Sequence, residues 1–227
     1  MFETFGGNRC TEYIRAYRQE EISAVECFRR ECDACGIIDM HALDSFLDSQ
    51  EVDQSFSSFI EYCNTHGFLS CIVSDGMDYY IKRILARHGL SHVPFLSNVL
   101  EFVPADDSPQ VRLTGKFPYT DEACDRCACC KRDYMLSVSA DDDSIVYIGE
   151  GYSDRCPARY ADVVFAKDEL LAHCRRENIA CFEYRTFGDI LKRMELLLVG
   201  NRGQANSSGL RKRRQAELAR REIFLGG

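Results

Sequence analysis

The sequence lacks the features that mark membrane-spanning and exported proteins. No stretch approaches the roughly 20 consecutive apolar residues that a transmembrane helix requires. Met1 is followed by Phe-Glu-Thr-Phe, whereas a secretory signal starts with a basic region that precedes an apolar one. The sequence also has no internal repeat. We therefore expect a cytoplasmic protein without a membrane partner.

An excess of basic residues is missing as well. The 227 residues contain 36 Asp and Glu against 28 Lys and Arg, which gives a formal net charge of -8. Because a protein that binds nucleic acid needs a basic surface to neutralise the phosphates, we expect no nucleic-acid partner. A small anionic substrate needs only a local positive pocket. The apolar fraction of 45% and the charged fraction of 28% are those of an ordinary globular protein.

The sequence contains 13 cysteines, an odd number. In a reducing cytoplasm most of them should be free, buried or metal-bound, so we expect no structural disulfide bonds. Cys124, Cys127 and Cys130 are spaced three residues apart with Cys129 between them, and thiolates at this spacing can bind Zn²⁺. Adjacent cysteines are awkward as joint ligands. Zinc binding and simple packing therefore both remain open for this cluster.

The first part of the chain has a helical pattern. Between Cys10 and His66 the apolar residues recur at helical spacing, with almost no β-branched runs. The Cys35-Gly36 pair and the stretch 49–53 carry residues that stop or cap helices. We therefore expect several helices with breaks at these two places.

From residue 67 onward the pattern predicts alternating strands and helices. An apolar run at 68–73 ends in Ser74-Asp75-Gly76 and precedes a helical stretch to Arg87. Later segments repeat this order, with strands at 144–148 and 162–165 and helices up to about Tyr160, at 168–177 and at 186–198. Continuous apolar strands between helices predict a doubly wound, mainly parallel α/β sheet with ligands at the carboxyl ends of its strands. Segments 98–103 and 111–114 predict a small hairpin.

The end of the chain has a different composition. Residues 200–209 are rich in Gly, Asn and Ser, which predicts a flexible linker. Residues 210–227 predict a basic helix that carries six Lys and Arg side chains between 211 and 221. A solvated helix face that packs through Leu218 and Ile223 is a simpler explanation of these charges than a binding tail.

Two of the predicted loops carry polar residues suited to a phosphate or a metal. Ser74 and the backbone N–H groups of Asp75 and Gly76 lie at a strand end and a helix start, where donors and the helix dipole favour an anion. Ser, Asp and Gly also turn well, so this signal is weak alone. In the second loop, Glu150 and Asp154 are four residues apart between glycines, and such carboxylates suit Mg²⁺. Helix capping would explain one of these acids but not both.

Three segments resemble the second, third and fourth motifs of haloacid dehalogenase superfamily phosphatases. They are Ser74-Asp75-Gly76, the Cys-x-x-Cys-x-Cys-Cys-Lys-Arg segment from Cys124 to Arg132, and the Ile-Gly-Glu-Gly-Tyr-Ser-Asp-Arg-Cys-Pro-Ala segment from Ile148 to Ala158. The nearest branch is similar to phosphoserine phosphatase and includes methylthio-diketopentyl-phosphate phosphatases and phosphocholine/phosphoethanolamine phosphatases. The resemblance covers about residues 1–190.

The resemblance implies a fold and a set of roles. It implies an N-terminal helical cap at 1–66 and a Rossmann-like phosphatase core at 67–199. The implied reaction is the hydrolysis of a small phosphorylated metabolite through an aspartyl-phosphate, with catalysis mainly by positioning and charge stabilisation. In the implied site, Lys131 and Asp154 are catalytic, Glu150 and Asp154 hold Mg²⁺, and the phosphate is bound by Ser74, Asp75, Gly76, Lys131 and Ser153.

The sequence departs from the family pattern at two places. Glu150 stands where this branch usually has Asp, one methylene shorter. The first motif of the superfamily, Asp-x-Asp-x-Thr, is absent, and its two acids are the nucleophile and the general acid/base. Neither Asp39 nor Asp75 is a suitable replacement. We therefore expect that the chain begins after the missing strand and that it has reduced stability and little turnover; the alternatives are a phosphate-binding protein without catalysis and a zinc protein.

Overall fold

The computed structural model describes residues 1–105, 109–121, 126–140 and 143–200, with only the backbone at 198–200. The chain divides into two compact units, and the division falls between Cys130 and Lys131 in the sequence. Every helix within the described residues is too short or too polar to span a bilayer. The predicted linker and basic helix lie outside the described residues from position 201 onward, and the division into a cap at 1–66 and a core at 67–199 stays a prediction.

The first unit begins with the predicted helices. Their breaks are where the sequence indicates: α3 ends at Cys35, Gly36 follows with a φ of 63°, and residues 49–55 separate α4 from α5. Ser23 caps α3 by accepting the Glu26 N–H, and Asp39 caps α4 by accepting the Ala42 N–H. The helices are α1 (Phe2–Gly6), α2 (Asn8–Arg18), α3 (Ala24–Cys35), α4 (Met40–Asp48) and α5 (Phe56–Thr65).

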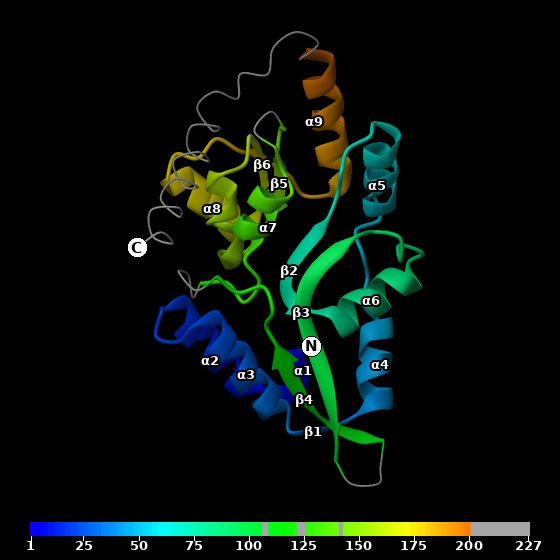
Figure 1. Cartoon of the computed structure of the whole chain (residues 1–227), viewed down its shortest axis with the longest axis vertical. Coiled ribbons are helices and arrows are strands. Elements are labelled where there is room, and N and C mark those ends of the chain that lie inside the picture. Colours follow the sequence, from blue (N-terminus) through cyan, green and yellow to red (C-terminus); the bar gives the residue numbers. More distant parts are fainter. Residues whose placement is uncertain (106–108, 122–125, 141–142, 201–227) are drawn as a thin grey trace. The chain divides into compact units, whose positions relative to one another are not determined.

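A four-stranded mixed sheet follows these helices in the first unit. Its strand order is β1-β4-β3-β2, where β2 pairs with β3 in parallel and the other pairs are antiparallel. Figure 1 shows β3 and β4 as a long hairpin, which confirms the predicted one and extends it at both ends. The elements are β1 (Ile37–Asp39), β2 (Ile72–Met77), α6 (Asp78–Arg87), β3 (Phe95–Pro104) and β4 (Gln110–Lys116).

The core of the first unit joins the N-terminal helices to this sheet. Leu43 and Leu47 from α4 pack with Met77, Leu100 and Leu113 from the strands, and these side chains are at most 5% exposed. Such burial is the main favourable term in folding. The helices and the mixed sheet therefore share one hydrophobic core.

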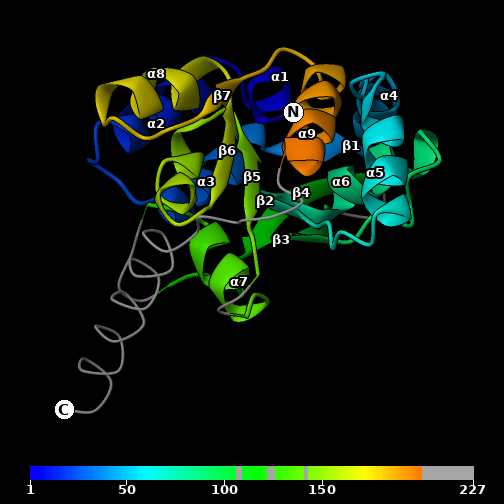
Figure 2. The same ribbon diagram turned by 90° about the horizontal axis from the view of Figure 1, so that it is seen from above.

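The second unit contains a three-stranded parallel sheet in the order β5-β6-β7. Figure 2 shows these strands side by side, and α8 packs on β6 through Leu170 and Cys174. Both predicted strands are present and β7 is an addition. The elements are α7 (Lys131–Ser137), β5 (Val146–Gly149), the 3₁₀ turns η1 (Tyr152–Asp154) and η2 (Pro157–Arg159), β6 (Val163–Ala166), α8 (Asp168–Arg176), β7 (Phe182–Glu183) and α9 (Phe187–Gly200).

The α/β class is confirmed, but the sheet topology is mixed. Parallel pairing holds for β2–β3 and for β5–β6–β7. The strands β3 and β4 are antiparallel because the short connection between them can only form a hairpin, and β1 adds antiparallel to β4. A doubly wound, Rossmann-like arrangement stays a prediction.

Candidate active site

The Ser74-Asp75-Gly76 segment of the first unit lies within a strand, not in a loop after one. The sequence predicts a strand at 68–73, whereas β2 spans Ile72–Met77. Val73 pairs with Leu96 and Met77 with Asn98, so three residues of β2 lie opposite the single residue Ser97. The segment is a bulge, which explains why turn-forming residues occur inside the strand.

Most polar groups of this bulge have protein partners. The Ser74 hydroxyl accepts the Gly76 N–H at 3.0 Å, and the Asp75 carboxylate accepts the Cys129 N–H at 3.0 Å. The fully buried Asn98 amide donates to the Asp75 carbonyl at 2.7 Å. A Cβ at Gly76 would collide with the Tyr80 hydroxyl, so a larger residue here would have to displace the Tyr80 ring. The bulge is thus held rigidly, with the Asp75 side chain committed to Cys129.

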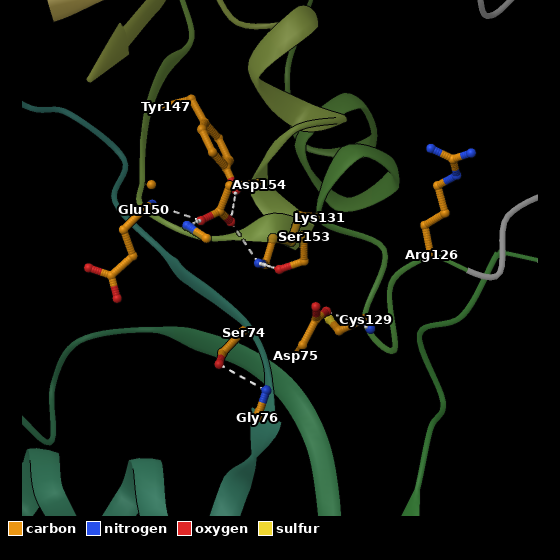
Figure 3. Close-up of polar contacts among 12 residues, drawn as sticks. Ser74, Asp75, Gly76, Arg126, Cys129, Lys131, Tyr147, Glu150, Ser153 and Asp154 are labelled. Atoms are coloured by element: carbon orange, nitrogen blue, oxygen red, sulfur yellow. Dashed lines mark hydrogen bonds and ion pairs between the residues drawn. The ribbon is translucent and has the colours of Figure 1, made fainter. Parts of the chain in front are cut away.

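The second unit concentrates its hydrogen bonds on one carboxylate, that of Asp154 (Figure 3). The Lys131 Nζ and the Tyr147 hydroxyl each donate to Oδ1 at 2.7 Å. The backbone N–H groups of Glu150 and Gly151 each donate to Oδ2 at 2.9 Å. Lys131 also donates to the Ser153 Oγ at 2.6 Å. The structure therefore brings together the predicted residues Lys131, Ser153 and Asp154.

The local sequence explains how a carboxylate can turn back onto its own loop. A Cβ at Gly149 would lie 2.8 Å from the Asp154 carboxyl carbon, a separation that real Cβ atoms do not show. Glycine at this position leaves the space that the carboxylate occupies. The short turn η1 then carries Asp154 close enough to reach the two amide groups at its start.

Neighbouring charge and hydrogen-bond donors keep Asp154 ionised in spite of its burial. Lys131 and Asp154 are only 7% and 8% exposed. Burial alone would raise the pKa of the Asp154 carboxyl, but the Lys131 ammonium, the Gly151 amide and the Tyr147 hydroxyl together hold this pKa below its usual range. The loop therefore presents a fixed negative charge beside a fixed positive charge.

The side chain of the other predicted metal ligand, Glu150, lies apart from this cluster. Figure 3 shows it pointing away from the Asp154 carboxylate. This side chain is 60% exposed, and its carboxylate forms an ion pair with Lys167 at 2.6 Å. Within the described ranges, His, Cys, Asp and Glu side chains form no group of three or more that could hold a metal ion. This loop thus offers two carboxylates at most, and Mg²⁺ there would need substrate or water oxygens as well.

Tyr147 is the residue of this cluster that sequence reasoning missed. It lies inside the apolar run 144–148, where the pattern indicates a side chain used for packing. Its position two residues before Gly149 places its ring on the same side of β5 as that glycine. A phenol among aliphatic strand residues is the only signal that the sequence offers.

The cysteine cluster is only partly within the described residues. Cys124 lies outside them, whereas Cys127, Cys129 and Cys130 are buried. The Cys129 N–H binds Asp75, and the Cys130 thiol lies 3.9 Å from an Asp121 carboxylate oxygen. Within the described residues, no two of the 12 cysteines are joined by a disulfide bond. Zinc binding by this cluster stays a prediction.

A comparison with protein families decides the identity of the chain. The family model described as "Putative Phosphatase" matches residues 33–178, which is well over half of the sequence. The chain belongs to this phosphatase family. It is a haloacid dehalogenase superfamily phosphatase of the phosphoserine-phosphatase-like branch, and by this family resemblance it is a phosphoric monoester hydrolase.

Named relatives of this phosphatase agree with that assignment. It is 28% identical over 163 residues to a 2-hydroxy-3-keto-5-methylthiopentenyl-1-phosphate phosphatase of Lysinibacillus sphaericus, with 68% of each chain covered. It is 29% identical over 153 residues to the protein of the same name from Exiguobacterium sibiricum, with 66% of this chain and 67% of the relative covered. The phosphatase therefore spans about two thirds of the length of these relatives.

Solved structures show the same fold at lower identity. A probable phosphoserine phosphatase from Vibrio cholerae matches with a TM-score of 0.62 and 17% identity, over 90% of this phosphatase but 61% of that chain. A phosphoserine phosphatase solved as a phospho-aspartyl intermediate analogue matches with a TM-score of 0.58 and 14% identity, over 82% and 85% of the two chains. At these identities the likeness establishes the α/β fold.

Proposed function

We propose that this protein is a Mg²⁺-dependent phosphomonoesterase that hydrolyses a small cytoplasmic phosphate ester. The observation that carries the proposal is the buried pair of Lys131 and Asp154, which are joined at 2.7 Å in the loop that resembles the fourth superfamily motif. A buried ion pair is costly to maintain in a protein interior, and such pairs are frequent in functional sites. This pair has the charges that phosphoryl transfer uses.

The roles of the individual residues follow from their chemistry. The Lys131 ammonium would neutralise charge on the transferring phosphoryl group, and Asp154 keeps this ammonium in place. Ser153 shares the ammonium and would orient phosphate oxygens through its hydroxyl. By the family resemblance, Ser74 and the backbone of Asp75 and Gly76 would contact the phosphate. Asp75 itself would act by fixing the bulge, because its carboxylate binds Cys129.

The donors in the 149–154 loop fit a Mg²⁺ site. Asp154 supplies a hard oxygen ligand that stays ionised, and the Lys131 ammonium already occupies Oδ1 as a cation. Glu150 supplies a second, exposed carboxylate on the same loop. We propose that Glu150 and Asp154 hold Mg²⁺ together with water and substrate oxygens. When bound, Mg²⁺ would neutralise charge on the phosphoryl group.

The names of the relatives suggest a substrate. Several relatives at 26–30% identity are 2-hydroxy-3-keto-5-methylthiopentenyl-1-phosphate phosphatases. We propose an ester of this class, a small phosphorylated ketone, as the first substrate to test. Phosphoserine is the second, because the fold matches a substrate-bound phosphoserine phosphatase with a TM-score of 0.58.

A second function is favoured by one observation. The sequence contains no Asp-x-Asp-x-Thr, and the two aspartates weighed as replacements have other roles. Asp39 caps α4, and Asp75 binds the Cys129 N–H. The chain as given would then bind a phosphate ester without turning it over.

The test compares two forms of the protein. Phosphate release from the methylthiopentenyl ester is measured with and without Mg²⁺, for the chain as given and for a form with an N-terminal extension that ends in Asp-x-Asp-x-Thr. Mg²⁺-dependent turnover that Asp154→Asn removes and the distant Asp189→Asn retains supports the phosphatase. Binding of the ester without turnover in both forms supports the second function. Absence of both binding and turnover contradicts the two proposals together.

A further inference from the structure

The Asp154 carboxylate has a full set of hydrogen-bond donors. An ionised carboxylate accepts at about four lone-pair positions. On Oδ2 the donors are the N–H groups of Glu150 and Gly151, and on Oδ1 they are the Lys131 ammonium and the Tyr147 hydroxyl. A metal ion that uses this carboxylate must therefore take the place of one donor.

The four donors differ in how easily they can be displaced. The Gly151 N–H belongs to the N-cap of the turn that carries Asp154, and the Glu150 N–H directly precedes it, so moving these two groups would distort the start of the turn. Lys131 is a buried cation, and separating a buried ion pair costs more than breaking a hydrogen bond from a neutral hydroxyl. The Tyr147 hydroxyl is thus the donor that is cheapest to displace.

We propose that the Tyr147 hydroxyl occupies the metal position on Asp154 Oδ1 in the ion-free protein and gives up that position when Mg²⁺ binds. This inference rests on the proposed Mg²⁺ site at Glu150 and Asp154. Tyr147 is a positioning residue: it acts through Asp154 by fixing the rotation of the carboxylate while no metal is present. A phenylalanine at 147 would keep the ring in β5 and remove only the competing donor.

The test measures Mg²⁺ binding to the full-length Tyr147→Phe variant by isothermal titration calorimetry. The melting temperature of the same variant is measured with and without Mg²⁺. We expect Mg²⁺ to bind the variant about tenfold more tightly than the wild type, which corresponds to about 1.4 kcal/mol. Without Mg²⁺ the variant should melt lower than the wild type, and saturating Mg²⁺ should remove this difference, because a ligand stabilises the state that it binds.

Tyr184→Phe is the matched control. The Tyr184 hydroxyl is buried and donates to the same loop, but to the Gly149 carbonyl at 3.5 Å. A purely structural tyrosine should lower the melting temperature equally with and without Mg²⁺, and we expect this from the control.

Two results would overturn the proposal. Unchanged or weaker Mg²⁺ binding by Tyr147→Phe, in a protein whose binding is lost in Asp154→Asn, would refute the role of Tyr147 and leave the proposed metal site intact. A wild type whose Mg²⁺ binding is insensitive to Asp154→Asn would refute the proposed metal site and the role of Tyr147 with it.

Discussion

The two segments that the sequence indicates as ligand loops, 74–76 and 149–154, are built in opposite ways. In segment 74–76 the charged group stabilises the fold: the Asp75 carboxylate accepts the Cys129 N–H, and the Asn98 amide donates to the Asp75 carbonyl. In segment 149–154 the fold stabilises the charged group, because two backbone amides, the Tyr147 hydroxyl and the Lys131 ammonium all donate hydrogen bonds to the Asp154 carboxylate. Two segments of similar Ser, Asp and Gly composition thus have different roles. Segment 74–76 is held by hydrogen bonds within the fold, whereas segment 149–154 carries a preorganised negative charge.

The largest effect should come from removing the cation of the second loop. Lys131→Met would leave the buried Asp154 carboxylate without its ion partner, and we expect a loss of about 3–5 kcal/mol in the free energy of unfolding. Urea denaturation measures this loss of stability. Lys82→Met is the control, since Lys82 pairs with Asp78 at 2.7 Å but is 63% exposed, and it should cost less than about 1 kcal/mol. Equal losses in the two variants would contradict a buried, structurally coupled pair at Asp154.

The space beside Asp154 predicts a difference between two glycines. A Cβ at Gly149 would lie 2.8 Å from the Asp154 carboxylate, whereas a Cβ at Gly151 would lie 3.8 Å from it, an ordinary contact. We expect Gly149→Ala to destabilise the protein by about 1–3 kcal/mol through overpacking, and Gly151→Ala by clearly less. Thermal unfolding of both variants checks this, and a larger effect at Gly151 would contradict the packing that the structure shows.

The buried acids of the two units should respond to pH with opposite signs. Burial, and secondarily Glu3, raises the pKa of Glu31 in the first unit from 4.5 to about 7. Because the folded state then binds this proton more tightly than the unfolded chain, Glu31 should lower stability as pH rises from about 4.5 to about 7. For Asp154 the folded pKa is lowered, so its stabilisation is present above the ordinary Asp range and is lost as pH falls through the folded pKa.

Denaturant titrations between pH 4 and 8 test the Glu31 part of this contrast. Glu31→Gln removes the titrating proton, so the variant should gain stability relative to the wild type as pH rises, by on the order of 1–3 kcal/mol at pH 8. Asp33→Asn, on the same helix, serves as the control. A stability difference that does not change with pH would show that Glu31 does not carry its proton into the neutral range.

The smallest effects should come from the first loop. Ser74→Ala removes a local hydrogen bond to the Gly76 N–H, and Asp75→Asn keeps an acceptor for the Cys129 N–H. We expect each to change the free energy of unfolding by about 1 kcal/mol or less. Phosphate-ester binding measured by calorimetry separates the two variants, since of these two side chains only that of Ser74 is proposed to contact the phosphate. Stronger loss of binding in Asp75→Asn than in Ser74→Ala would reverse that assignment.

The predictable parts of the fold are those with a long, regular pattern. The helices between Cys10 and His66 and the hairpin of β3 and β4 follow from apolar spacing, and the break after α3 follows from Gly36. The short strands β1 and β7 were missed because two or three residues carry no measurable alternation. The bulge in β2 cannot be distinguished from a loop by sequence, since Ser-Asp-Gly has the composition of a turn wherever it occurs.

The sequence predicts which residues form the candidate site but not all of the partners that their side chains bind. Lys131, Ser153 and Asp154 meet as expected. The ion pair of Glu150 with Lys167 could not be foreseen, because it depends on which way an exposed side chain turns. Tyr147 was hidden for a different reason: a strand residue looks the same in sequence whether its hydroxyl is buried against a carboxylate or solvated.

The bulge in β2 also sets which insertions and deletions the first unit can tolerate. Between Val73 and Met77 the strand runs four residues while its partner runs two, so the bulge is an excess of two residues. Side chains alternate with a period of two along a strand, so this excess returns Met77 to the face on which it is fully buried. Deleting one residue from 74–76 would turn Met77 outward, whereas deleting two would restore a regular strand and keep the core intact.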